Sequence, residues 1–113
     1  MHELAVTQQV LDIAVRHAEE AHATRIREIE IVIGDMTSFV NDAVQFCFDA
    51  LSTGTIAEGA ELSFRRVPVT IRCRECGAVF APEDLDLTCP DCGAYAGEVI
   101  AGREFFIDHI DVE

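Results

Sequence analysis

Four of the five cysteines lie in two Cys-x-x-Cys-Gly units, Cys73 to Gly77 and Cys89 to Gly93. Two sulfurs three positions apart on a tight turn can bind one ion, and two facing turns supply four thiolates in a tetrahedron with bonds of about 2.3 Å. Glycine after each second cysteine allows a positive φ, so the chain can curl round the metal and point backbone N–H groups at the sulfurs. The spacing predicts a structural zinc ion held by Cys73, Cys76, Cys89 and Cys92.

Other uses of these cysteines stay open from the sequence. An iron–sulfur or rubredoxin-like iron centre would take the same thiolates. A thioredoxin-type redox pair should open a helix in a βαβ unit, and neither pair is followed by helical periodicity. A catalytic zinc keeps one coordination position for water, which four thiolates would close, so hydrolysis is not expected. Cys47 falls in an apolar helical pattern and is expected to be a small buried hydrophobic residue, not a ligand.

The segment Met1-His2-Glu3 carries a second set of metal donors. The α-amine, the deprotonated amide nitrogen of His2 and its imidazole can close adjacent chelate rings, and Glu3 can add a carboxylate or its own amide. Strong in-plane nitrogen donors favour square-planar Ni(II) or Cu(II) over tetrahedral zinc. Taken alone, the segment is better explained by a frayed terminal histidine and an ordinary first-turn carboxylate that the helix dipole favours.

The hydrophobic periodicity predicts the elements that position these donors. Helical spacing covers residues 3–22 and about 41–52, and strand-like patterns cover 26–33, 61–65, 69–72, 98–100 and 104–112. This order predicts an α+β fold, with two helices packed on one face of a small mixed sheet and an inserted four-cysteine zinc-ribbon-like domain. We expect residues 1–69 and the strand 101–113 to form one domain, with 70–100 as the inserted zinc-binding domain.

Two local expectations follow from this pattern. The apolar residues of 104–112 follow no single parity, which predicts a strand covered on both faces. The insert has little more than Val79, Phe80, Leu85 and Leu87 to bury, so its metal must hold it together.

The charge balance excludes some functions. The chain has 21 acidic residues against eight basic ones, all arginine, and a net charge of −13. Such a chain is repelled by a polyanion, so phosphate-mediated nucleic-acid binding is not expected. No stretch reaches the roughly 18 apolar residues that a membrane span needs, and the first residues do not read as a secretion signal. We expect a cytoplasmic protein with neither nucleic acid nor membrane as its partner.

The whole pattern resembles one known family. The shared features are Met1-His2-Glu3-Leu4 at the start of a helix, a strand ending at Gly34, Phe46 to Leu51 followed by Gly54-Thr55, Glu58 to Ala60, both cysteine pairs, and Gly102 to Glu104 before the last strand. Together they resemble the HypA/HybF family of nickel metallochaperones for hydrogenase maturation. The resemblance covers essentially the whole chain.

The resemblance implies a function without catalysis. Members deliver Ni(II) to the precursor of the nickel-iron hydrogenase large subunit and work with the GTPase HypB, and some also serve urease. The nickel site would use Met1 through its α-amine, His2 and, as a contributor, Glu3, while the zinc cysteines fall on the four predicted above. A homodimer is left open. The alternative is a zinc-ribbon adaptor that binds nucleic acid or transcription machinery.

Overall fold

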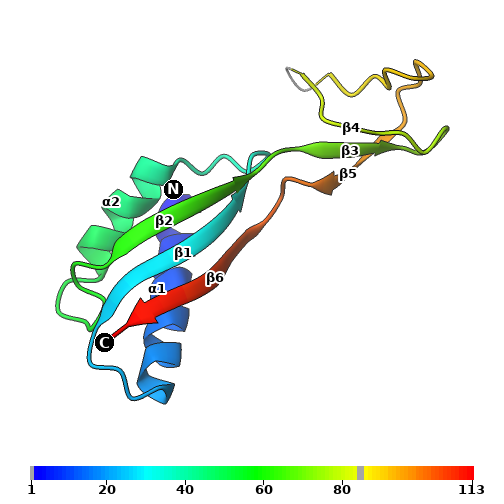
Figure 1. Ribbon diagram of the computed structural model, residues 1–113. Coiled ribbons are helices and arrows are strands. Elements are labelled where there is room, and N and C mark those ends of the chain that lie inside the picture. Colours follow the sequence, from blue (N-terminus) through cyan, green and yellow to red (C-terminus); the bar gives the residue numbers. More distant parts are fainter. Residues whose placement is uncertain (1, 84–85) are drawn as a thin grey trace. The chain divides into compact units, whose positions relative to one another are not determined.

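The computed structural model describes residues 2–83 and 86–113 (Figure 1). Its elements are α1 (His2–Glu20), β1 (Ile26–Gly34), α2 (Asn41–Leu51), β2 (Glu61–Val67), β3 (Thr70–Cys73), β4 (Val79–Phe80), β5 (Gly97–Ala101) and β6 (Phe105–Val112). The predicted helices and strands are confirmed to within two residues at each end. Strand β4 was not predicted, because two residues are too few to show an alternation.

The chain divides into two compact units. The first contains the residues up to Val32 together with Ser38–Arg65 and Phe105–Glu113, and the second contains Ile33–Thr37 and Arg66–Glu104. That residues 70–100 form an inserted domain that folds as a separate unit stays a prediction.

The first unit is built on a sheet with the strand order β2-β1-β6. Figure 1 shows β1 and β2 running in the same direction and β6 in the opposite one, so the sheet is mixed. Both helices cover the same face of this sheet. The predicted α+β class and the two-helix layer are therefore confirmed.

Helix α1 packs through small and branched apolar residues. Val10, Leu11, Ala14 and Ala18 are buried at helical spacing. The helix ends in a Schellman-type turn, in which the Ala23 N–H donates to the Ala18 carbonyl at 2.9 Å and the His22 N–H to the Glu19 carbonyl at 3.0 Å. His22 occupies the left-handed position of this turn with φ +58°.

Helix α2 buries a narrower face than its sequence suggests. Val44 and Phe48 are fully buried, four positions apart on one side of the helix. Phe46 is 76% exposed, although it belongs to the apolar pattern, because it lies on the opposite side. The expectation that Cys47 is buried was also wrong, since its side chain is only partly covered. A short helix of 11 residues that packs on a three-stranded sheet buries only the one stripe of its side chains that faces the sheet.

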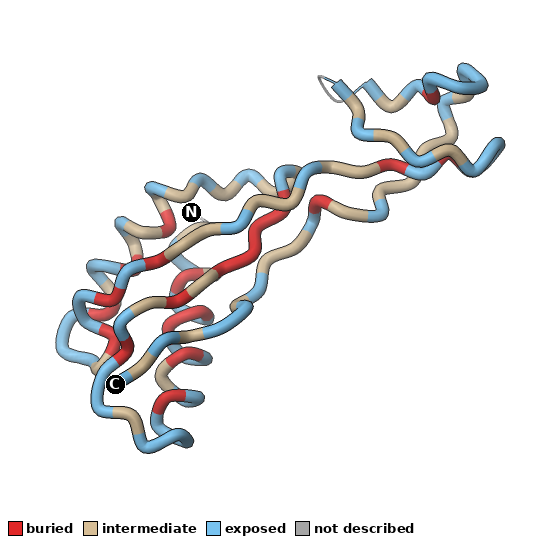
Figure 2. The backbone as a smooth tube through the Cα atoms, viewed as in Figure 1, coloured by how far each residue is buried: buried red, intermediate tan, exposed pale blue. Residues whose placement is uncertain are grey.

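Strand β1 supplies the centre of the core. Ile29, Ile31 and Ile33 are fully buried, as their alternation indicates, and Figure 2 shows buried residues along this strand.

Strand β6 corrects the expectation of a strand covered on both faces. Phe105 and Ile107 are partly buried and Phe106 is 48% exposed, so one face is open. The ambiguous parity arises because the alternation shifts phase at Asp108 and His109, two consecutive exposed residues. Phe105 is held by an edge-to-face contact with Phe39, with ring centroids 5.0 Å apart.

The second unit contains a small antiparallel sheet in the order β4-β3-β5. Ile71 of β3 is fully buried between Phe80 and Val99, its partners on either side. Gly97 makes room for it, since a Cβ there would lie 2.4 Å from the Ile71 Cγ2 atom. Val79, which the sequence assigns to the small core, is 59% exposed, and that expectation was wrong. Leu85 lies outside the described residues.

Candidate metal centre

The first cysteine pair continues directly from the sheet of the second unit. Cys73 is the last residue of β3 and pairs with Gly97 of β5. After it the chain turns back, so that the Cys73 N–H donates to the Ala78 carbonyl at 2.8 Å and the Gly77 N–H to the Cys73 carbonyl at 2.8 Å. Gly77 has φ +79°, which explains the glycine at this position.

The second pair repeats the same backbone turn. The Cys89 N–H donates to the Ala94 carbonyl at 2.9 Å, and the Gly93 N–H to the Cys89 carbonyl at 2.9 Å. Gly93 has φ +74°. In addition, the Cys92 N–H points at the Cys89 sulfur at 3.5 Å. Two equivalent knuckles are therefore formed, and one of them shows an N–H aimed at sulfur as the sequence predicts.

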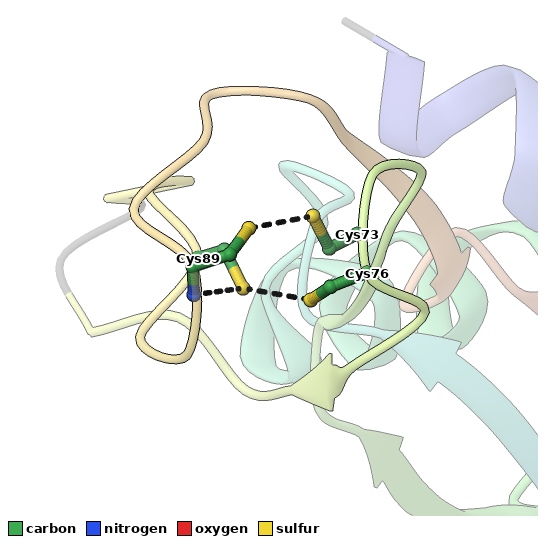
Figure 3. Close-up of side chains that lie close together, drawn as sticks. Cys73, Cys76 and Cys89 are labelled. Atoms are coloured by element: carbon green, nitrogen blue, oxygen red, sulfur yellow. Dashed lines mark hydrogen bonds between the residues drawn. The ribbon is translucent and has the colours of Figure 1, made fainter.

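The four sulfurs face one another across the two knuckles (Figure 3). The Cys73 and Cys92 Sγ atoms are 3.7 Å apart, the Cys76 and Cys89 Sγ atoms are 3.6 Å apart, and all four lie within 4.8 Å of one another. A tetrahedron with metal–sulfur bonds of about 2.3 Å has edges of about 3.8 Å. The donor set and its spacing therefore fit one tetrahedral metal ion.

Redox use of the pairs receives no support from this geometry. All five cysteines are free, and the close sulfur contacts join the knuckles. They bring Cys73 to Cys92 and Cys76 to Cys89, rather than the two cysteines of one Cys-x-x-Cys unit to each other.

Burial and charge are shared unequally among the thiols. Cys73 and Cys89 are buried, while Cys76 and Cys92 are exposed. The backbone N–H of Cys92 is the main cause that lowers the pKa of Cys89 to about 7. The Ala78 backbone lowers the pKa of Cys76, but hydrogen bonding to Cys89 and desolvation outweigh it and raise the pKa to about 12. The Cys76 thiol thus stays protonated at neutral pH unless a cation lies among the sulfurs.

An ion-pair cluster lies beside the first cysteine pair, where Arg72 of β3 and Arg74 both contact Glu98 of β5. The Arg72 Nε donates to Glu98 Oε1 at 3.0 Å, and Arg74 approaches Glu98 Oε2 at 3.4 Å. Hydrogen bonding and charge from Arg72, and then from Arg74, lower the pKa of Glu98. Both arginines of this segment are therefore engaged by a carboxylate.

The amino-terminal donors are placed only in part. Met1 lies outside the described residues, and His2 is the first residue of α1. Glu3 is partly buried in the first helical turn, where its carbonyl accepts a hydrogen bond from the buried Thr7 hydroxyl. The structure thus puts His2 and Glu3 at the amino-terminal end of α1.

A third group of donors was missed by the sequence reasoning. Ligand atoms of Glu30, Asp108 and His109 lie within 4.8 Å of one another. Glu30 is on β1 and the other two are on β6, so pairing of distant strands creates the cluster. The adjacent Asp108 and His109 were the available signal, but alternation would place them on opposite faces.

Comparison with known proteins assigns a family. The family model described as hydrogenase/urease nickel incorporation, metallochaperone, HypA matches residues 1–112. A hydrogenase maturation factor HypA from Dehalococcoides mccartyi is 48% identical over 113 residues, which is 100% of this chain and 95% of that protein. One from Caldanaerobacter subterraneus is 41% identical over 115 residues, covering 100% of both.

Solved structures show the same fold. A solution structure of a HypA protein matches with a TM-score of 0.77 and 22% identity, over 100% of this chain and 97% of that one. The solution structure of the Ni metallochaperone HypA from Helicobacter pylori matches with a TM-score of 0.67 and 20% identity, over 97% and 96%. Among the described residues, neither helix is long and apolar enough to cross a membrane. From the family match and the whole-chain relatives, we conclude that this chain belongs to the HypA family of hydrogenase maturation factors.

Proposed function

We propose that this protein is a nickel carrier that binds Ni(II) at Met1, His2 and Glu3 and delivers it to the precursor of the nickel-iron hydrogenase large subunit, working with the GTPase HypB. The observation that carries the proposal is the family match over residues 1–112, whose description names nickel incorporation. The proposed ligands are the Met1 α-amine, the amide nitrogen and imidazole of His2, and Glu3 as a contributor.

The start of α1 favours the use of the His2 amide. The first N–H groups of a helix have no acceptor within the helix. Deprotonation of the His2 amide by nickel therefore breaks no helical hydrogen bond, because α1 begins at this residue. An in-plane set of nitrogen donors suits Ni(II), and its position at a helix end leaves the ion accessible for transfer.

We infer that the ion at Cys73, Cys76, Cys89 and Cys92 is zinc and that its role is structural. Four thiolates at tetrahedral spacing suit Zn²⁺ and leave no position for a reacting water. The protein would then be a carrier and not an enzyme. Bound zinc would fix the two knuckles without taking part in nickel transfer.

The proposed partners follow from the family and the charge. A net charge of −13 disfavours nucleic acid and favours basic surfaces on protein partners. Cytoplasmic location is part of the proposal, since the hydrogenase precursor and HypB would be met there. A homodimer would be compatible with the same site.

The test is metal content after loading. Protein loaded with Ni(II) and passed through gel filtration should retain one zinc and one exchangeable nickel per chain. His2→Ala should lose the nickel and keep the zinc, whereas His22→Ala, which removes an imidazole at the other end of α1, should keep both. Residues added before Met1 should also weaken nickel binding. Unchanged nickel in His2→Ala would falsify the assignment.

A further inference from the structure

Glu30, Asp108 and His109 form a donor cluster on the sheet of the first unit that the cysteine site and the proposed amino-terminal site leave unused. Glu30 comes from the central strand β1, and the other two come from the neighbouring strand β6. Asp108 and His109 are exposed, and Glu30 is partly exposed. An ion in solution can therefore reach all three side chains.

The phase shift in β6 creates this cluster. In a regular strand, consecutive side chains point to opposite faces. Here both Asp108 and His109 are exposed, and the His109 Nδ1 and Asp108 Oδ2 atoms are 3.0 Å apart. Two ligands at about 2.1 Å from one ion and at right angles to each other are also about 3.0 Å apart. A metal ion can thus replace the proton between these two atoms without moving the strand.

The charges at the cluster favour a cation. Two carboxylates face each other, and Arg65 of β2 lies 3.7 Å from Glu30 Oε1 and 3.5 Å from Asp108 Oδ1. These distances exceed the about 2.7–2.9 Å of a charge-assisted hydrogen bond, so Arg65 binds neither oxygen tightly. Arg65 partly neutralises the carboxylates and would compete with an incoming ion.

The surroundings leave room for further ligands. An open groove of about 280 Å³ between α1 and β6 is lined by Asp108 and His109, with His17 on the helix side. Glu30 does not line this groove, but Asp108 and His109 are exposed, so water or a donor from a partner protein can complete the coordination of an ion held by three protein atoms. A coordination shell completed by exchangeable ligands favours rapid exchange of the ion over tight retention.

We propose that Glu30, Asp108 and His109 form a second, weaker site for a divalent transition-metal ion such as Ni²⁺, bound through one imidazole nitrogen and two carboxylate oxygens. Imidazole selects Ni²⁺ and Zn²⁺ over Mg²⁺ and Ca²⁺, which prefer oxygen-only sites. With three donors on an exposed surface, the ion is lost during gel filtration and is detected only at higher free metal. The site stands independently of the amino-terminal proposal.

The experiment is a Ni²⁺ titration followed by NMR, using zinc-loaded protein in which His2→Ala and residues added before Met1 disable the other proposed site. Resonances of Glu30 and of residues 107–110 should broaden first. His109→Ala and Asp108→Asn should each weaken this binding by about tenfold or more. Arg65→Gln should strengthen it, because it removes the competing cation.

Matched controls separate a site from general attraction to an acidic protein. His22→Ala removes an imidazole elsewhere, Asp111→Asn removes the same charge three positions along β6, and Arg25→Gln removes a cation from another ion pair. None of them should change the affinity as the cluster variants do. Equal effects of Asp111→Asn and Asp108→Asn, or broadening spread over many carboxylates, would overturn the proposal. The carrier function is tested separately, by whether His2→Ala loses the nickel that the unsubstituted protein retains through gel filtration.

Discussion

Gly34 and Gly102 approach so closely that a Cβ on Gly34 would lie 2.0 Å from the Gly102 carbonyl oxygen. The Met36 N–H donates to that same carbonyl at 2.8 Å, and the Gly34 N–H donates to the Glu104 carbonyl at 2.8 Å. Gly102 itself has φ +119°. These backbone atoms have no freedom to move away, because hydrogen bonds hold them on both sides. The contact explains the glycine at position 34, whereas at position 102 the positive φ and the Val69 Cα atom, 2.9 Å from where a Cβ would lie, require glycine.

We predict that Gly34→Ala lowers the free energy of unfolding by about 3 kcal/mol or more, because the clash is with backbone and not with a side chain that can rotate. Urea denaturation measures the change. Gly59→Ala is the control, since a Cβ there meets nothing within 4 Å and only its φ of +80° opposes alanine. It should cost about 1–2 kcal/mol. Equal losses in the two variants would contradict the close contact.

Metal removal should unfold the second unit first. Its small sheet has one fully buried large residue, Ile71, so the four thiolates must supply most of its stability. Zinc in comparable small sites contributes about 10–16 kcal/mol. Chelation should therefore move the NMR amide shifts of residues 70–101 to unfolded values, while the amide shifts of α1 and α2 stay unchanged.

Cysteine substitutions provide the control for chelation. Cys89→Ser should release the metal and unfold the same segment, whereas Cys47→Ser, on α2, should retain one metal per chain. Shifts of residues 70–101 that stay unchanged after the metal is removed would refute a structural role.

The end of α1 offers a stabilising substitution. His22 has φ +58°, where a residue with a Cβ is disfavoured and glycine is not. His22→Gly should raise the free energy of unfolding by about 1 kcal/mol, and His22→Ala should not raise it. Thermal unfolding of the three proteins at one pH measures this. A destabilised His22→Gly would show that the imidazole, not the backbone, matters at this position.

Asp108 and His109 should titrate as a pair. Their hydrogen bond is the main cause that raises the pKa of His109 and lowers that of Asp108. Glu30, Asp108 and Glu28 also raise the His109 pKa by their charge, and Arg65 further lowers the Asp108 pKa. A raised histidine pKa stabilises the fold below about 6.5, and this contribution is lost as the pH rises through the folded value. Because the pKa of Asp108 is lowered from 3.8, its carboxylate stabilises the fold above about pH 3.8, and this stabilisation is lost as the pH falls through the folded pKa.

NMR titration of the His109 imidazole in metal-free buffer should therefore give a pKa above 6.5. Asp108→Asn should lower it toward that value, and Asp111→Asn should leave it nearer to the native one. A His109 pKa at or below 6.5 in the unsubstituted protein would contradict the hydrogen bond seen in the structure.

The sequence predicted the parts of this fold that depend on local periodicity. Ile29, Ile31 and Ile33 alternate along the chain, and the Cys-x-x-Cys-Gly units fix their own turns, so both could be assigned without tertiary information. The cluster of Glu30 with Asp108 could not be assigned, because it depends on which strands pair and on the phase shift in β6. No local pattern records a pairing between residues so far apart in the sequence.

The exposure of Phe46 leads to a last prediction. Phe46 and Phe48 are two positions apart on α2 and chemically identical, but the first is 76% exposed and the second is fully buried. Phe48→Ala should cost about 3–5 kcal/mol of unfolding free energy, and Phe46→Ala should change it by about 0.5 kcal/mol or less. Urea denaturation of the two variants measures this difference. Comparable losses would contradict this and mean that Phe46 is buried in solution. If a second copy of the chain buries it, the unfolding free energy should also depend on protein concentration.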